Sequence, residues 1–322
     1  MTTLGMLSSR WVVWVMLVVA LGGCASAPPA PPAGPAPAAA PAPPTASAPP
    51  APAVAAPAPA PAPAGPAAPA NDLLNAVLWM QRSVEFKAAA LGAFALARMR
   101  LDQGLADRSW TAAPREQTGA YQSLPPAIIL DIDETILDNS GYQAWMTLKD
   151  TTFDPKTWTA YVNTVSSVAI PGAVEFTKYA ADKGVKVFYV SNRTVEEKPA
   201  TLRNLEKYGF PMAGADTVLA ARERPDWGSA KGTRRAHIAR THRIVLNLGD
   251  NFGDFVDEYR GNEAERQKVL EQHMARWGRE WIMLPNPTYG SFESAPFGHD
   301  FKLSPAERRR AKRSVLEARP GP

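Results

Sequence analysis

Two aspartates, Asp131 and Asp133, follow a short apolar run, residues 128–130, and could do chemistry there. The run is β-branched and preceded by two prolines, which predicts a buried strand of a parallel sheet. In open α/β sheets, ligands bind at the carboxyl ends of the strands, where both aspartates would lie. Carboxylates this close repel each other, so a fold tolerates them mainly where a cation or a reaction uses them. The segment predicts a metal-binding or catalytic site, although an acidic loop after a strand gives the same pattern.

Further polar side chains stand at the ends of two more predicted strands and at the start of a helix between them. They are Ser191 and Asn192 after residues 185–190, Lys231 at the helix start, and Asp250 and Asp254 after residues 244–248. Each also has an ordinary interpretation: a serine cap, a solvated lysine, and a turn followed by a helix cap. Their order along the chain, at these strand ends, favours a single site at one edge of a sheet.

The elements that would position these groups alternate between strands and helices. Apolar spacing predicts a helix from residue 74 to about 102 as a helical N-terminal addition, and strands at 128–130, 185–190, 217–219, 244–248 and 281–284. Helices are predicted between the strands, at 171–183, at 198–208 and from 231. An aromatic-rich cap insertion occupies about residues 140–168. This alternation predicts an α/β fold with a doubly wound parallel sheet.

The N-terminal 70 residues differ in composition from the rest. Residues 1–23 have a basic start, an apolar stretch too short to span a bilayer comfortably, and small residues before Cys24, the single cysteine. This pattern is similar to a bacterial lipobox, in which Cys24 is lipidated, although an ordinary secretory peptide is an alternative. Residues 24–70 are almost entirely Ala and Pro, which predicts an extended tether. We therefore expect the folded domain to occupy residues 71–322.

The charge pattern excludes one class of partner. The net charge is +4, and Lys and Arg are interspersed with Asp and Glu through most of the domain. No basic stripe indicates binding to a nucleic acid polymer. A basic run follows a capped helix start at residue 304, and we expect it to be a solvated helix, with contact to anionic lipid as the alternative.

Six segments carry a family resemblance: residues 131–140 (DIDETILDNS), 170–176 (IPGAVEF), 187–193 (VFYVSNR), 229–231 (SAK), 249–255 (GDNFGDF) and 282–290 (IMLPNPTYG). Together they resemble the class C acid phosphatases, which are outer-membrane lipoproteins among the four-aspartate phosphatases of the haloacid dehalogenase-like superfamily. The resemblance covers roughly residues 72–300. It implies a periplasmic enzyme anchored in the outer membrane that hydrolyses phosphomonoesters.

The resemblance also implies roles for the polar groups. Asp131 would be the nucleophile and Asp133 the general acid and base. Mg²⁺ would bind the carboxylates of Asp131 and Asp250 and the backbone carbonyl of Asp133, with Asp254 acting mainly through a metal-bound water or by orienting the site. The remaining polar groups, Ser191, Asn192 and Lys231, would hold the phosphoryl oxygens.

The sequence determines the substrate less closely than it determines the reaction. The resemblance implies that aromatic side chains near the mouth stack on nucleobases, and Tyr142, Trp158 and Tyr289 lie in the matching segments, with core packing as the alternative. Nucleoside 5′-monophosphates or nicotinamide mononucleotide are the expected substrates. Transfer of the phosphoryl group to an acceptor alcohol, and a non-catalytic tethered binding protein, remain alternatives. The sequence leaves the oligomeric state open, a homodimer included.

Overall fold

The computed structural model describes residues 72–319 and residue 321. The predicted leader, Cys24 and tether lie outside these described residues. Within residues 72–319, no helix combines the length and the apolar character that a membrane span requires.

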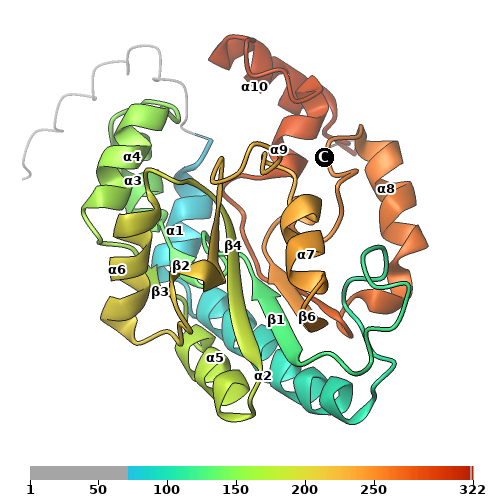
Figure 1. Ribbon diagram of the computed structural model, residues 1–322. Helices are drawn as coiled ribbons and strands as arrows, with labels where there is room; N and C mark the ends of the chain where they lie inside the picture. The colour runs from blue at the N-terminus through green and yellow to red at the C-terminus, as the bar shows by residue number, and fades with distance from the viewer. Residues whose placement is uncertain (1–71, 320, 322) are drawn as a thin grey trace, which may run out of the picture. The chain divides into compact units, whose positions relative to one another are not determined.

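Five parallel strands form the central sheet in the order β5-β4-β1-β6-β7 (Figure 1). They are β1 (Pro126–Leu130), β4 (Lys186–Thr194), β5 (Val218–Ala221), β6 (Arg243–Gly249) and β7 (Trp281–Met283). The chain leaves β1 in one direction, toward β4 and β5, and returns to its other side at β6 and β7. The strand order therefore reverses between β1 and β6, and such a switch point is where open α/β sheets bind ligands. This topology confirms the predicted doubly wound fold.

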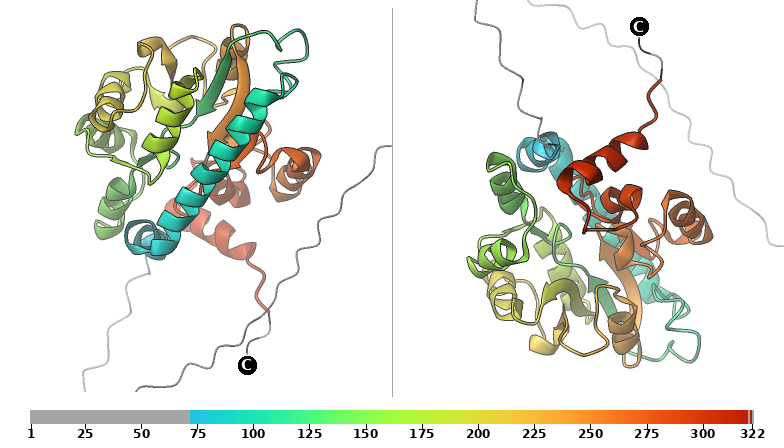
Figure 2. Two further views of the ribbon diagram at one scale, coloured as in Figure 1. Left: turned by 90° about the horizontal axis from the view of Figure 1, so that it is seen from below. Right: turned by 90° about the horizontal axis from the view of Figure 1, so that it is seen from above.

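Helices cover both faces of the sheet. They are α1 (Leu74–Arg82), α2 (Val84–Ala106), α3 (Ser140–Leu148), α4 (Pro155–Asn163), α5 (Ala173–Asp182), α6 (Lys198–Tyr208), α7 (Gly232–Ala239), α8 (Glu263–Gln272), α9 (Ser291–Ser294) and α10 (Pro305–Ser314). Ile128 and Leu130 of β1 point into a core with α2 and α5, which run side by side in Figure 2. The alternate residue Ile129 points into a second core that includes Ile238 of α7. Because β1 is buried on both faces, its sequence is apolar at every position rather than at alternate ones.

The predicted N-terminal helix is two helices. Ser83 interrupts it with an extended backbone, and its hydroxyl accepts a hydrogen bond from the Phe86 amide at 3.0 Å, which caps α2. Apolar spacing continues across Ser83, so the periodicity could not reveal the break. The helix α2 also continues to Ala106, four residues beyond the predicted end.

The insertion consists of α3 and α4, and a small antiparallel pair closes it at its base. The pair is β2 (Leu137–Asp138) with β3 (Val168–Ala169), each two residues long. Strands this short have no periodicity of their own, so the sequence did not predict them. The pair joins the two ends of the insertion directly after the segment that carries Asp131 and Asp133.

Two further elements differ from the sequence predictions. The strand β4 continues to Thr194, where it pairs with Ala221 after a register shift, so Ser191 lies within β4 instead of after it. The helix α8 was not predicted, because none of its residues is buried and its sequence has no apolar stripe. A capping box between Asn262 and Glu265 marks its start instead.

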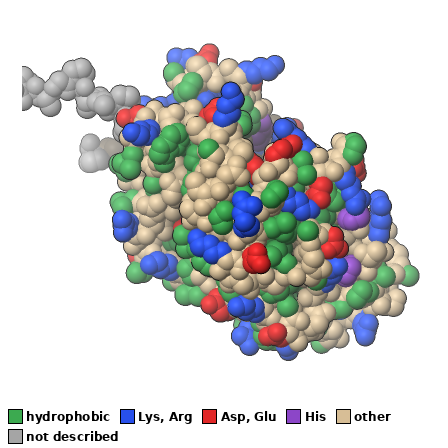
Figure 3. Space-filling view, turned by 60° about the vertical axis from the view of Figure 1, so that its left-hand side comes forward, with side chains coloured by type: hydrophobic (Ala, Val, Ile, Leu, Met, Phe, Trp, Pro, Cys, Tyr) green, Lys and Arg blue, Asp and Glu red, His purple; other side chains and the backbone are tan. Residues whose placement is uncertain are grey.

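The C-terminal basic helix α10 has the predicted capping box between Ser304 and Glu307, and none of its residues is buried. Arg309 forms an ion pair with Asp72, and Lys312 forms one with Glu293. On the face of the molecule in Figure 3, basic and acidic side chains are interspersed without a continuous basic stripe.

Candidate active site

Three carboxylates meet at the carboxyl end of the sheet. Asp131 follows β1, Asp250 follows β6, and Asp254 ends the short turn after it. One oxygen from each lies within 4.8 Å of the others. The Asp131 amide donates to the Leu248 carbonyl at 3.0 Å, which ties the ends of the two strands together. The switch point between β1 and β6 is therefore what assembles this cluster.

Lys231 is the counter-charge of the cluster. It stands at the N-cap position of α7, is 4 % exposed, and forms ion pairs with Asp131 and, at 2.6 Å, with Asp254. The alternative of a solvated surface lysine is therefore wrong. Burial lowers the pKa of the Lys231 ammonium, but the two carboxylates raise it, and the balance lies above the ordinary value.

Charge compensation in the cluster is incomplete. Three carboxylates and one ammonium leave two negative charges when all four groups are ionised. Burial raises the pKa of Asp131 to about 7, with Asp254 and Asp133 raising it and Lys231 opposing them. Burial also raises the pKa of Asp250, and the nearby Asp254 and Asp131 raise it further. An all-oxygen set of this charge fits a hard divalent cation, which would restore the carboxylates to their ionised forms.

Two side chains that the sequence analysis left without a role hold Asp250. The Thr135 hydroxyl donates to one oxygen of Asp250 at 3.0 Å, and the Asn286 amide donates to the other at 2.9 Å. Both lie in segments recognised above, and Asn286 follows β7, so its place after a strand end was the available signal. Asp254 is held in turn, because its carboxylate accepts from the Asn251 amide at 2.9 Å.

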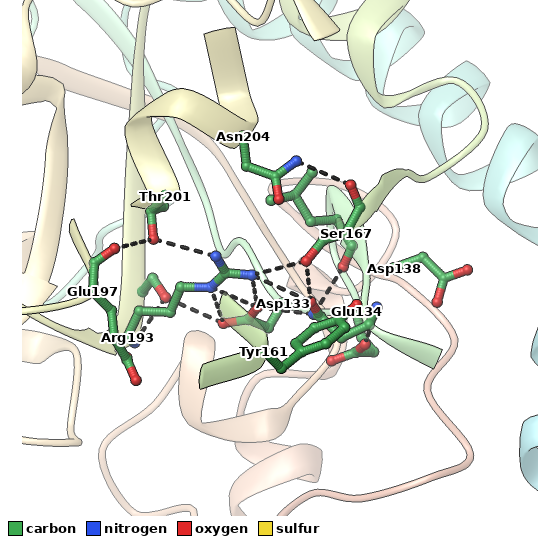
Figure 4. Close-up of polar contacts among 12 residues, drawn as sticks. Asp133, Glu134, Asp138, Tyr161, Ser167, Arg193, Glu197, Thr201 and Asn204 are labelled. Atoms are coloured by element: carbon green, nitrogen blue, oxygen red, sulfur yellow. Dashed lines mark hydrogen bonds and ion pairs between the residues drawn. The ribbon is translucent and has the colours of Figure 1, made fainter. Parts of the chain in front are cut away.

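Asp133 does not join the carboxylate cluster with its side chain. Its Oδ1 accepts from Arg193 Nη2 at 2.8 Å and from Asn139 Nδ2 at 2.9 Å (Figure 4). A metal contact of Asp133 was predicted through its backbone carbonyl only, and it remains a prediction. No role was predicted for Arg193.

Ser191 and Asn192 are held by a second buried arginine. Arg234 is 0 % exposed, and its guanidinium donates to the Ser191 carbonyl, to the Asn192 side chain at 2.8 Å and to the Gly228 carbonyl at 2.9 Å. The Ser191 hydroxyl accepts from the Arg193 amide at 2.9 Å. Arg234 therefore connects the end of β4 to the loop before Lys231, although its place in a basic helix gave no sign of burial.

The three predicted substrate aromatics lie in different surroundings. Tyr142 is 2 % exposed and packs between Trp145 and Trp158, with ring centroids at 5.7 and 5.3 Å. Trp158 is half-buried, and the Arg193 guanidinium lies 5.6 Å from its ring centroid. Stacking of these aromatics on a substrate remains a prediction, and for Tyr142 the packing alternative accounts for the contacts observed.

Tyr289 faces a buried acid. Its hydroxyl donates to Glu134, whose other oxygen accepts from the Asn139 amide at 2.8 Å. Burial and, after it, the charge of the adjacent Asp133 raise the pKa of Glu134 to about 8. Burial and Glu134 both raise the pKa of Tyr289. The Tyr289 hydroxyl therefore already donates its hydrogen bond to a residue of the protein.

The chain belongs to the acid phosphatases of the haloacid dehalogenase superfamily, subfamily IIIB, whose family model matches residues 60–292, more than half of the sequence. Among solved structures, it is similar to the class C acid phosphatase from Bacillus anthracis, with 34 % identity and a TM-score of 0.68 over 77 % of this chain and 97 % of that one. A structure of the class C acid phosphatase from Bacillus anthracis with tungstate bound matches with 33 % identity and a TM-score of 0.67, covering 77 % of this chain and 97 % of that one. These findings confirm the predicted class C acid phosphatase and its enzyme class.

Two plant proteins are also similar. The stem 31 kDa glycoprotein of Glycine max is 27 % identical over 166 residues, and the stem 28 kDa glycoprotein of Glycine max is 24 % identical over 165 residues. Each alignment covers 50 % of this chain and 58 % of the plant protein.

Proposed function

We propose that the chain hydrolyses small phosphomonoesters with the help of Mg²⁺ and through a phosphoryl group carried on Asp131. The observation that supports this most is the cluster of the buried Asp131 and Asp254 with the partly buried Asp250, which has one lysine for three carboxylates. A carboxylate held beside a cation at the switch point can approach a phosphorus atom, whose negative oxygens the cation and Lys231 attract.

The reaction runs in two displacements. An oxygen of Asp131 attacks phosphorus while the bond to the leaving alcohol breaks, and Asp133 donates its proton to that alcohol. Asp133 then takes a proton from water, which attacks phosphorus and releases phosphate and Asp131. Lys231, the Ser191 hydroxyl and the Asn192 side chain hold the phosphoryl oxygens through both steps.

Mg²⁺ would be held by the carboxylates of Asp131 and Asp250 and the backbone carbonyl of Asp133. When bound, it neutralises the charge that repels an anionic ester from an anionic nucleophile. Asp254 supports the site by holding Lys231 and the Asn251 amide. Trp158, half-buried beside Asp133's partner Arg193, is the aromatic side chain best situated to contact a nucleoside, so nucleoside 5′-monophosphates and nicotinamide mononucleotide are the proposed substrates.

The test uses the full chain stripped of metal with a chelator. Hydrolysis of p-nitrophenyl phosphate at acid pH should require added Mg²⁺, and Asp131→Asn should lower kcat by at least about 10³-fold. Acid quench after mixing with labelled substrate should trap an acyl phosphate in the wild type and none in the variant. Asp216→Asn, an exposed aspartate outside the site, is the matched control. Full turnover without metal, or an active Asp131→Asn, would contradict the proposal.

The cellular location is proposed from the sequence alone. Lipidation of Cys24 would anchor the chain in the outer membrane, and residues 24–70 would hold the phosphatase domain away from it in the periplasm. Metabolic labelling with a fatty acid, followed by membrane fractionation, should give a labelled membrane protein. In Cys24→Ser both the label and the membrane association should disappear, and their persistence would remove the anchor from the proposal.

A further inference from the structure

The two oxygens of the Asp133 carboxylate have different surroundings (Figure 4). Oδ1 accepts three hydrogen bonds, from Arg193 Nε at 2.9 Å, Arg193 Nη2 at 2.8 Å and Asn139 Nδ2 at 2.9 Å. Oδ2 has only longer contacts, to Arg193 Nε at 3.2 Å and the Ser191 hydroxyl at 3.4 Å. A carboxylate oxygen has about two lone-pair sites, so Oδ1 is saturated and Oδ2 is the oxygen with capacity left for a proton.

Arg193 is itself fixed from several sides. Its side chain is 1 % exposed, and Nη1 donates to the Thr201 hydroxyl of α6 at 3.2 Å. Nη2 also donates to the side-chain Oδ1 of Asn139 at 3.2 Å, and this oxygen in turn accepts from the Ser167 hydroxyl at 2.6 Å. The guanidinium therefore links Asp133, α6 and the base of the insertion, and it cannot turn without breaking contacts to all three.

Neutralising the charge of Asp133 would not by itself require an arginine. A lysine would neutralise Asp133, as Lys231 does for its neighbours, but an ammonium cannot place a fork of donors on one chosen oxygen. The planar guanidinium fixes both the rotation of the carboxylate and which oxygen stays available. The Asp133 side chain is 15 % exposed, whereas the side chain of Arg193 behind it is 1 % exposed.

We propose that Arg193 is a positioning residue for general-acid catalysis: with Asn139 it occupies Oδ1 of Asp133, and so directs Oδ2 to deliver the proton to the leaving oxygen. The inference rests on the proposed function, in which Asp133 is the acid. Arg193 itself transfers no proton and makes no bond to the substrate.

The consequence concerns the leaving group. A p-nitrophenolate departs without needing a proton, whereas the alkoxide of an alkyl phosphate departs slowly unless it is protonated. Loss of the positioning of Asp133 should therefore slow alkyl phosphates much more than p-nitrophenyl phosphate. A purely structural defect would slow both substrates by the same factor.

The experiment compares kcat/KM for p-nitrophenyl phosphate and glycerol 2-phosphate in the full chain with Mg²⁺. In Arg193→Lys, which keeps the charge but removes the fork, we expect glycerol 2-phosphate hydrolysis to fall about 100-fold and p-nitrophenyl phosphate hydrolysis less than about 10-fold. Arg243→Lys is the matched control, because Arg243 is also buried but binds backbone carbonyls at the opposite end of the sheet. It should leave the ratio of the two substrates unchanged.

The variant Asp133→Asn distinguishes a failure of the positioning role of Arg193 from a failure of the acid role of Asp133. If Asp133→Asn is selective for the alkyl ester and Arg193→Lys is not, the acid remains Asp133 and the positioning role is overturned. If Asp133→Asn slows both esters equally, the acid role fails and the inference fails with it. Should Arg193→Lys not fold, Asn139→Ala removes one donor to Oδ1, and a smaller loss with the same selectivity is expected. Equal loss for both esters in Asn139→Ala would overturn the proposal.

Discussion

Asp131 and Asp133 stand two residues apart in one loop, yet the protein treats their charges in opposite ways. Asp131 shares a single lysine with Asp254 and lies beside Asp250, so the cluster has more negative than positive charge. Asp133 has an arginine of its own, together with an asparagine, and its compensation is complete. We call Asp131, Asp250, Asp254 and Lys231 the metal side. We call Asp133 with its partners Arg193 and Asn139 the arginine side.

The difference shows two ways to bury a carboxylate. On the arginine side the chain supplies the cation, so the structure is complete without any addition. On the metal side the chain leaves charge for an external cation, so stability there should depend on metal and on pH.

Lys231→Met should have the largest effect on stability. It removes the one cation of the metal side and leaves Asp131 and Asp254 buried without a counter-charge. At pH 8, in the presence of chelator, we expect the free energy of unfolding to fall by about 3–5 kcal/mol. Urea denaturation measures this, and added Mg²⁺ should restore part of the loss. A loss below about 1 kcal/mol would mean that the cluster is not isolated from water.

Asp250→Asn should separate metal binding from stability. We expect Mg²⁺ affinity to fall by about 100-fold, since even partners behind a ligand affect affinity by 10–100-fold. The metal-free variant should nevertheless be more stable than the metal-free wild type, because one of three repelling carboxylates is gone. Titration calorimetry and urea denaturation with chelator check the two halves, with Asp216→Asn as control. A less stable metal-free variant would contradict the charge imbalance.

The stability of the metal-free protein should decrease as pH rises. The pKa of Asp131 is about 7 in the folded chain against 3.8 ordinarily, so the folded state binds its proton more tightly than the unfolded state does. This contribution is complete below pH 4 and is lost as pH rises through 7. Thermal unfolding between pH 4 and 8 should show a shallower decline in Asp131→Asn, and in the wild type with saturating Mg²⁺. Identical slopes in all three samples would refute the assignment.

Ser167→Ala should have the smallest effect, and it tests the arginine side. It removes the hydroxyl that donates to Asn139 at 2.6 Å and lies 3.5 Å from Arg193 Nη2. We expect a loss of about 1 kcal/mol in the free energy of unfolding, with no change when Mg²⁺ is removed. Urea denaturation with and without chelator measures both. A metal-dependent loss would show that the two sides are coupled.

Much of the fold was predictable because its signals are local. The helix at residues 198–208 and the end of the helix before Gly184 were predicted at or within a residue of their bounds, because apolar spacing and glycine mark them in the sequence. Elements without such signals were missed. The two-residue strands of the insertion are too short for periodicity, α8 has no apolar stripe, and the break at Ser83 lies within continuous apolar spacing.

The residues of the site also fall into those that the sequence predicted and those that it did not. Strand ends and motif order predicted that Asp131, Asp250, Asp254 and Lys231 lie together, because the carboxyl edge of a parallel sheet gathers the residues that follow its strands. They did not predict that Ser191 lies within β4 or that the Asp133 side chain binds Arg193. Arg193 and Arg234 received no role, since an arginine in a strand or in a basic helix has the same sequence appearance whether it is buried or solvated. The sequence alone also could not distinguish whether Tyr142 packs within the protein or contacts the substrate.

Hydrophobic periodicity and turn residues act over a few positions, so the sequence alone was enough to predict the five strands of the central sheet and most residues at their ends. Which charges meet depends on the tertiary structure. Lys231 lies 100 residues from Asp131, and Arg193 lies 60 residues from Asp133. Such pairings depend on how the strands are ordered and how deeply each side chain is buried, and no local pattern contains either quantity.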